Sequence, residues 1–304
     1  MNKALDPSAA LAASLTRAGS RHTYLTICWL VDRDLVSDAF RAYAYFRWLD
    51  DVIDVMPLSR DQRLAFFREQ KSLMTRLHAG DRPQDLAPEE ATLACLIEHD
   101  RRSHGGLDSY LRNMMAVMEF DARRRGRLIS QDELDGYTRN LSTAVMDGLS
   151  YFIGHHYGYP ETEERYHAVA AAHISHMLRD AVADAEAGYY NIPREVLEAG
   201  RIAPSDFHAP AYQDWVRSRV ALAQDLFRQG KRYIRRLDHL RARLAGLAYC
   251  ARFESVLDTI ERADYVLQLE DKRARRPALQ PALSRSSASE VPGAHSTSRA
   301  SSEG

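Results

Sequence analysis

The chain has 304 residues, of which 45% are hydrophobic and 27% are charged, a composition that predicts one large folded domain with a substantial core. The formal net charge of −1 and the dispersed arginines give no electrostatic case for nucleic-acid binding. Three scattered cysteines without a CxxC motif argue against a disulfide framework and a cysteine zinc site, and they favour the reduced cytoplasm.

No apolar stretch approaches the length of a membrane span, and the apolar run from Ala9 to Ala13 is too short for a signal peptide. We therefore expect a soluble, cytoplasmic protein with at most peripheral membrane contact and no nucleic-acid partner.

Apolar residues recur at helical spacing along most of the chain, and no alternating run is long enough to predict a strand. A capping box of Ser130 and Glu133 indicates where the longest middle helix begins, and Pro160 is expected to open the next one. The predicted helices cover Ala39 to Val55, Asp61 to His78, Glu89 to Arg101, Leu107 to Arg124, Ser130 to about His156, Pro160 to Gly188, a short segment from Pro193, Tyr212 to Arg236, and Leu247 to about Arg273. Residues 1–276 are thus expected to form one all-α domain, followed by a disordered tail at 277–304.

The first functional signal lies on the helix predicted at Ala39 to Val55. Asp50, Asp51 and Asp54 share one face, and Arg47 and Tyr43 extend this stripe toward the start of the helix. Almost every other side of the helix is apolar, so the helix should be buried and its carboxylates should face an internal cavity or a charged partner. A solvated acidic face is the alternative interpretation.

The second signal lies on the helix predicted to open at Pro160. Asp180 and Asp184 are four positions apart on one face, beside Arg179, and His176 and His173 continue the face toward the start of the helix. Crowded carboxylates repel one another, and a divalent cation relieves this repulsion. Oxygen ligands on rigid helices suit Mg²⁺, which bridges to substrate phosphates. A diphosphate held between two such helices becomes a good leaving group, and the allylic cation left behind needs an apolar pocket.

These residues resemble the signatures of the squalene and phytoene synthase family. The stretch from Tyr43 to Asp54 is similar to its tyrosine-rich helix that ends in DxxxD. Its second signature is matched by Arg179, Asp180, Asp184, Gly188 and the helix from Pro193 to Leu197, and its middle segment by Asp121 and by Leu134 to Tyr137. The likeness extends from about Ser20 to Tyr265.

The resemblance implies a single isoprenoid-synthase-type helical domain with a central cavity. It implies Mg²⁺ bound by the aspartates and an allylic prenyl diphosphate as substrate. The implied metal ligands are Asp50, Asp51, Asp54, Asp180 and Asp184; the implied diphosphate-binding residues are Arg47, Arg179, Arg21, Tyr43 and Tyr249; Tyr137 is expected near the reacting centre.

The chain departs from the family pattern at several positions. His173 and His176 stand where the family has glutamine and asparagine, and Gly188-Tyr189-Tyr190-Asn191 replaces Gly-Arg-x-Tyr. Head-to-head condensation needs two diphosphates held at once, and these changes affect donors for the second one. We therefore interpret the chain as a prenyltransferase whose acceptor is a small aromatic ring, indole- or carbazole-like, in secondary metabolism.

In that interpretation His173, His176 or Asn191 orients the acceptor or removes the ring proton. The alternative is orthodox condensation with a second prenyl diphosphate as acceptor. A more distant alternative is a metal-binding helical bundle with zinc or iron on His173, His176 and Asp180.

Overall fold

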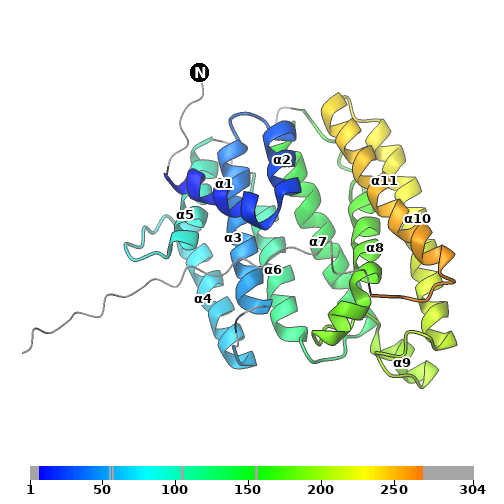
Figure 1. Ribbon diagram of the computed structural model, residues 1–304. Coiled ribbons are helices and arrows are strands. Elements are labelled where there is room, and N and C mark those ends of the chain that lie inside the picture. The colour runs from blue at the N-terminus through cyan, green and yellow to red at the C-terminus, as the bar shows by residue number, and fades with distance from the viewer. Residues whose placement is uncertain (1–6, 55, 57, 104–105, 155–156, 270–304) are drawn as a thin grey trace, which may run out of the picture.

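The computed structural model describes residues 7–54, 56, 58–103, 106–154 and 157–269, and these ranges contain eleven α-helices and no strand (Figure 1). The predicted all-α fold is confirmed. The helices are α1 (Pro7–Gly19), α2 (Arg21–Leu30), α3 (Val36–Asp54), α4 (Arg60–Ala79), α5 (Pro88–Ser103), α6 (Asp108–Arg124), α7 (Gln131–Phe152), α8 (Glu164–Glu186), α9 (Arg194–Gly200), α10 (Pro210–Arg235) and α11 (Leu240–Arg262).

Local chemistry fixes where several helices begin and end. Ser59 and Ser130 form complete capping boxes at the starts of α4 and α7, so backbone N–H groups that lack a helical partner are satisfied there. Gly80 ends α4 in the left-handed region at φ 97°, a conformation that glycine adopts without a steric penalty.

Some predicted boundaries were wrong. The helices α1 and α2 were not predicted, and α8 begins at Glu164 rather than at Pro160. The helix α7 ends at Phe152, shortly before Gly154 turns the chain at φ 76°. The helix α11 begins at Leu240, seven residues before its predicted start, and ends at Arg262. The predicted disordered tail lies outside the described residues.

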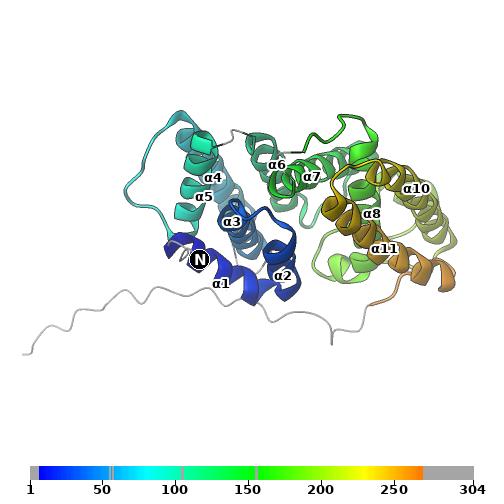
Figure 2. The same ribbon diagram turned by 90° about the horizontal axis from the view of Figure 1, so that it is seen from above.

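The helices pack around two adjoining hydrophobic clusters. The first half of the chain forms one cluster around α3, and α7, α8, α10 and α11 form the other. Tyr137 on α7 packs against both clusters. Viewed from above, α1–α6 lie on one side and α8–α11 on the other, with α7 between them (Figure 2). Within the described residues, no helix is both long and apolar enough to cross a membrane.

Close packing of α8 on α10 depends on Gly230. A Cβ atom built on Gly230 would lie 2.6 Å from the backbone nitrogen of Ala168, a distance that real side chains do not reach. Any larger residue at this position would push α10 away from α8, the helix that carries the second aspartate pair.

Candidate active site

The last turns of α3 carry the first aspartate group. Nη1 of Arg47 lies 3.2 Å from Oδ2 of Asp50, and Nη2 donates a hydrogen bond to Asp51. The rest of this part of α3 is buried, so the carboxylates lie on the face that is turned away from the core. Asp50 itself keeps 40% of its side chain exposed.

The last turns of α8 carry the second group. Nε and Nη2 of Arg179 donate hydrogen bonds of 2.9 Å to the two carboxylate oxygens of Asp180. Nε2 of His176 lies 3.0 Å from Oδ2 of the same carboxylate. Asp184, one turn later, accepts a hydrogen bond of 2.9 Å from Nδ2 of Asn191. Asp180 is thus held by two cationic or polar donors, and Asp184 by an amide.

The ends of α3, α6 and α8 meet at one place. The hydroxyl of Tyr189, just after α8, donates a hydrogen bond of 2.8 Å to Oδ1 of Asp54 on α3. Arg125, just after α6, donates to the carbonyl oxygen of Ile53 at 3.4 Å and to that of Ala187 at 3.3 Å. The two aspartate groups therefore border the same site.

A further aspartate, Asp121, contributes to the site from α6. Oδ1 of Asp121 accepts a hydrogen bond of 2.6 Å from Nε of Arg124, and Oδ2 accepts one of 2.9 Å from the hydroxyl of Tyr137. Nη1 of Arg124 also donates to Oδ1 of Asn191 at 2.7 Å. Since Asn191 binds Asp184, a continuous network joins α6, α7 and α8.

Aromatic rings surround the guanidinium of Arg124. It lies 5.1 Å from the ring centroids of Tyr137 and Tyr189 and 5.8 Å from that of Phe120. Arg124 is 7% exposed; burial lowers the pKa of the guanidinium, but the charge of Asp121, its hydrogen bond and the charge of Asp184 act together with Tyr137 to raise that pKa overall. A fixed positive charge thus stands between the two aspartate groups.

Burial, with a smaller contribution from neighbouring carboxylates, raises the pKa values of two motif aspartates. Partial burial and then the charge of Asp54 raise the pKa of Asp50, against the opposing effect of Arg47. Burial raises the pKa of Asp184 to about 6, and Asp180 contributes in the same direction. For Asp180, the hydrogen bonds from His176 and Arg179 outweigh burial and hold its pKa below the usual range.

These carboxylates fit a hard divalent cation. Burial, and after it the neighbouring carboxylates, raises the pKa values of Asp50 and Asp184, and a bound cation would offset both effects. The described residues contain no closed group of three or more His, Cys, Asp or Glu ligands. A pair of carboxylates on each helix instead suits Mg²⁺, which keeps several waters and shares phosphate oxygens.

His173 is a buried residue of α8 and lies beside Tyr137. The two rings meet edge to face with centroids 5.0 Å apart, and Nε2 of His173 has no hydrogen-bond partner among the described residues. Burial lowers the pKa of His173 to about 3, so the ring is neutral. His173 thus faces Tyr137 while His176 binds Asp180, and the predicted three-ligand zinc or iron site is not formed.

Of the three remaining expected residues, Tyr249 connects to the site through aromatic rings. Tyr249 on α11 packs on Phe253 at 5.0 Å, and Phe253 meets the ring of His176 at 6.3 Å. Tyr43 lies on α3 one turn before Arg47 and interacts with it electrostatically. Arg21 is exposed in the first turn of α2, and no contact joins it to the aspartates in the described part of the chain.

Sequence reasoning gave no role to Arg124, Arg125 or Tyr189, and it noted Asp121 only as a match. The sequence does contain one sign of the Asp121–Arg124 pair: the two residues are three positions apart at a helix end, a spacing that allows an ion pair. Tyr189 appeared only as a departure from the family pattern.

Three surface cavities, of about 570, 200 and 390 Å³, are lined by other residues. They give no measure of the space between the two aspartate groups. The predicted central cavity therefore stays a prediction.

The sequence is similar to a known protein family and to a curated protein of that type. Residues 16–280 match the squalene/phytoene synthase family. The presqualene diphosphate synthase of Rhodopseudomonas palustris is 28% identical over 170 residues, which cover 55% of this chain and 56% of that protein. The chain thus spans about half the length of the curated relative it matches.

Solved structures share the fold. The squalene synthase HpnC from Alicyclobacillus acidocaldarius has a TM-score of 0.69 at 19% identity, covering 87% of this chain and 97% of that one. A dehydrosqualene synthase crystallised with a ligand has a TM-score of 0.65 at 18% identity, covering 88% of this chain and 90% of that one. The expected isoprenoid-synthase type of helical domain is thereby confirmed.

Proposed function

Because the chain belongs to the squalene/phytoene synthase family, we propose that it is a prenyltransferase that ionises an allylic prenyl diphosphate where α3, α6 and α8 end. The observation that carries this proposal is the meeting of the two aspartate groups, which Tyr189 joins through its hydrogen bond to Asp54. Two acidic groups at one site suit a polyanionic diphosphate only if cations lie between them.

The donor diphosphate binds between the two groups. Arg47 and Arg179 lie beside the aspartates and donate to its oxygens. Asp50 and Asp54 on one side and Asp180 and Asp184 on the other would hold Mg²⁺, which offsets the charge on the leaving diphosphate when bound. The carbon–oxygen bond then breaks, and the diphosphate leaves with the electron pair.

The allylic cation forms beside aromatic rings. The ring centroids of Phe120, near the end of α6, and Tyr137, near the start of α7, are 5.0 Å apart. The ring of Tyr137 also contacts that of His173. Aromatic faces stabilise a nearby cation without reacting with it as water would. The hydrogen bond to Asp121 keeps the Tyr137 ring in one orientation.

We propose a second prenyl diphosphate as the acceptor. Its double bond attacks the cation, and a proton is lost to the released diphosphate. The presqualene diphosphate, squalene and dehydrosqualene synthases among the relatives favour this acceptor over the aromatic ring that the sequence departures first suggested.

A physical reason also weakens the argument from those departures. The chain lacks the family's arginine at Tyr189, but the guanidinium groups of Arg124 and Arg125 lie 5.1 and 5.8 Å from the Tyr189 ring. Positive charge is therefore present at this position, supplied from α6 and the residue after it.

An aromatic acceptor is the second candidate, favoured by one observation. Nε2 of His173 is buried and lacks a hydrogen-bond partner among the described residues, and the ring is neutral. A neutral imidazole in this position can orient a ring N–H by accepting its hydrogen bond.

Incubation with Mg²⁺ and farnesyl or geranylgeranyl diphosphate as the sole organic substrate separates the two candidates. Head-to-head condensation gives a C30 or C40 product that still carries the acceptor's diphosphate, and it is detected in an organic extract after phosphatase treatment. Diphosphate release that yields no such product, and a prenylated ring once an indole or carbazole is added, would favour the second candidate. Intact substrate under all these conditions would contradict both.

A further inference from the structure

The end of the bundle opposite the aspartates exposes several large apolar side chains. The helix α3 begins at Val36 near this end and reaches Asp54 after 19 residues, a rise of about 27 Å. Four exposed side chains, here named the apolar patch, are 71% (Trp29), 53% (Tyr157), 56% (Leu240) and 59% (Leu244) exposed. Isolated exposed leucines are ordinary, but a group of large apolar residues at one end of a molecule marks an interaction surface.

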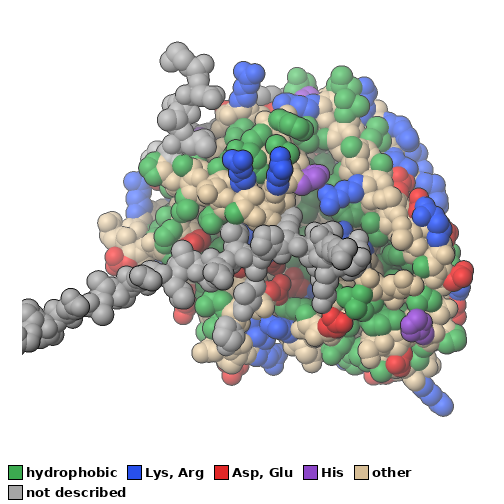
Figure 3. All heavy atoms as spheres, in the orientation of Figure 1, with side chains coloured by type: hydrophobic (Ala, Val, Ile, Leu, Met, Phe, Trp, Pro, Cys, Tyr) green, Lys and Arg blue, Asp and Glu red, His purple; other side chains and the backbone are tan. Residues whose placement is uncertain are grey.

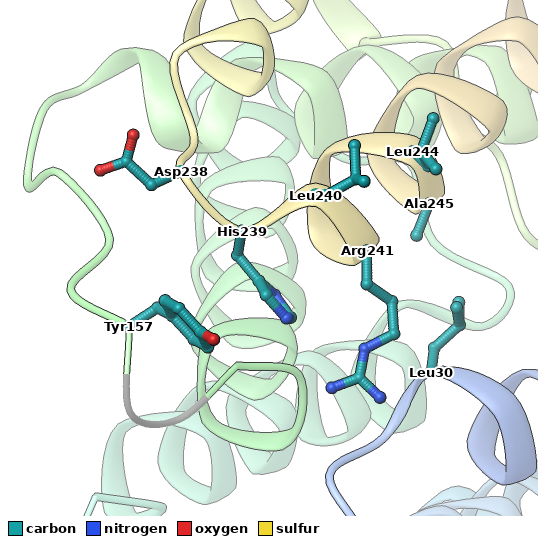
Figure 4. Close-up of a pocket in the computed structure, with 8 residues that line it drawn as sticks. All are labelled: Leu30, Tyr157, Asp238, His239, Leu240, Arg241, Leu244 and Ala245. Atoms are coloured by element: carbon teal, nitrogen blue, oxygen red, sulfur yellow. The ribbon is translucent and has the colours of Figure 1, made fainter.

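The patch surrounds a surface cavity of about 570 Å³. Its lining comes from the end of α2, the connection before α8, and the corner between α10 and α11 (Figure 4). The ring of Tyr157 stacks on that of His239, with centroids 4.4 Å apart and planes 18° apart. Leu30 lines the opposite side of the cavity, next to Trp29 in the chain.

Polar contacts hold these segments together. Asp32 accepts a hydrogen bond of 2.7 Å from Arg241 on α11 and one of 2.8 Å from the backbone N–H of Gly154. The largely buried carboxylate of Asp32 thus connects the segment after α2 with the end of α7 and the start of α11. The apolar side chains are therefore presented from a fixed framework rather than from a frayed end.

Basic residues are interleaved with the patch. Residues 29–34 and 235–245 contain five arginines against three aspartates, in a chain with a formal net charge of −1. The arginines are Arg33, Arg235, Arg236, Arg241 and Arg243, and the aspartates are Asp32, Asp34 and Asp238. Figure 3 shows hydrophobic and basic side chains next to one another along the upper edge of the view, above α2 and α11.

We propose that the apolar patch and its arginines dock on the surface of an anionic lipid bilayer. Tryptophan, tyrosine and leucine enter the boundary between headgroups and acyl chains, while arginines bind lipid phosphates beside them. A symmetric contact with a second copy of the chain would instead place these arginines against one another, and like charges at an interface repel. This inference is independent of the acceptor and of the reaction.

Vesicle binding of the purified full-length chain tests the proposal. We expect the chain to float with vesicles of phosphatidylcholine and phosphatidylglycerol, and to bind less to phosphatidylcholine alone. Replacing Trp29 and Leu244 by serine should weaken binding by about tenfold or more, because each loses apolar surface that enters the bilayer. The matched control is Leu222→Ser, since Leu222 is 41% exposed but lies in the middle of α10, beside a different cavity.

Tryptophan emission gives a second readout. Of the three tryptophans, Trp29 is the one that is largely exposed, so anionic vesicles should shift its emission to shorter wavelength. Trp29→Phe should remove this shift while the chain still binds, because phenylalanine keeps an apolar ring.

Three results would overturn the proposal. The first is absence of binding to anionic vesicles. The second is binding that the double serine variant retains. The third is a lipid-free dimer that the same variant dissociates, which would assign the patch to a second copy of the chain.

Discussion

The hydroxyl of Tyr189 donates a hydrogen bond of 2.8 Å to Oδ1 of Asp54, although 135 positions separate the two residues in the chain. The backbone N–H of Tyr189 also donates to the carbonyl oxygen of Asp184 at 2.7 Å. One residue therefore contacts an aspartate from each motif, and it fixes the end of α3 relative to the end of α8.

Removing one motif carboxylate should stop ionisation of the donor. In Asp50→Asn or Asp180→Asn, kcat/KM for diphosphate release should fall by about a thousandfold, because a negative ligand is lost where leaving-group charge develops. A coupled assay of released diphosphate measures this. Asp61→Asn, at an exposed position in the first turn of α4, is the control and should keep the parent rate. Parent-like turnover by either motif variant would refute the assignment of that aspartate.

Tyr189→Phe removes only the hydroxyl that contacts Asp54. The free energy of unfolding should fall by about 1 kcal/mol, the usual net contribution of one hydrogen bond. Activity should fall by about tenfold because the two motif helices are less firmly aligned. Urea unfolding and diphosphate release are the measurements. Tyr190→Phe changes the neighbouring tyrosine, whose hydroxyl makes no hydrogen bond within the described residues, and equal effects in both variants would contradict this account.

Arg124→Met should destabilise the fold. The substitution leaves Asp121 buried without its cationic partner, and such losses cost about 3–5 kcal/mol. Urea unfolding followed by circular dichroism measures the change. Arg123→Met, at the exposed neighbouring position, removes an ion pair with Glu119 and should cost no more than about 1 kcal/mol. Similar values for the two variants would show that Arg124 does not organise the site.

The stability of the protein should depend on pH through His173. Burial lowers the pKa of His173 to about 3 from its ordinary 6.5. Below about pH 6.5 the unfolded chain therefore binds a proton that the folded chain does not, and the free energy of unfolding falls as pH falls toward 3. The contribution of one such group is about 1.4 kcal/mol for each pH unit. Above pH 6.5 the ring is neutral in both the folded and the unfolded chain, so no stability is lost through His173 there.

In His173→Gln this loss of stability on acidification should be absent, so the difference in unfolding free energy between parent and variant should change with pH below about 6.5. Urea unfolding at several pH values between neutral and acidic conditions measures it. His208→Gln, at an exposed site, should leave the parent slope unchanged. A His173 variant with the same slope as the parent would show that the buried ring is protonated in the folded state.

Helices with strong boundary residues could be predicted from the sequence. The bounds of α3, α4 and α6 lie within a few residues of their predicted ends, because Pro57, Gly80 and the glycine pair before α6 interrupt the helical pattern. The helix α1 was missed because its buried face consists largely of small alanines, which give a weak periodic signal.

Pro160 was misassigned for a different reason. It looked like a first helical residue, but its carbonyl oxygen accepts hydrogen bonds from Thr162 at 3.1 Å and from Tyr233 on α10 at 3.1 Å, so the chain turns before α8 begins. The sequence contains no local sign of the contact with Tyr233.

In the candidate site, too, some features could be predicted from the sequence and others could not. The face shared by Asp50 and Asp54, and that shared by Asp180 and Asp184, follow from helical spacing and could be predicted. The contacts of Tyr189 with Asp54 and of Arg124 with Asn191 depend on how the segment after α8 meets the ends of α3 and α6. Helical periodicity carries no information about such contacts.

Crystals grown with Mn²⁺ and inorganic diphosphate test the central claim most directly, because the anomalous signal of Mn²⁺ locates each bound metal. We expect metal beside Asp50 and Asp54 and also beside Asp180 and Asp184, with one diphosphate bridging the two groups. Metal at one group alone, or a diphosphate bound away from both, would contradict the account.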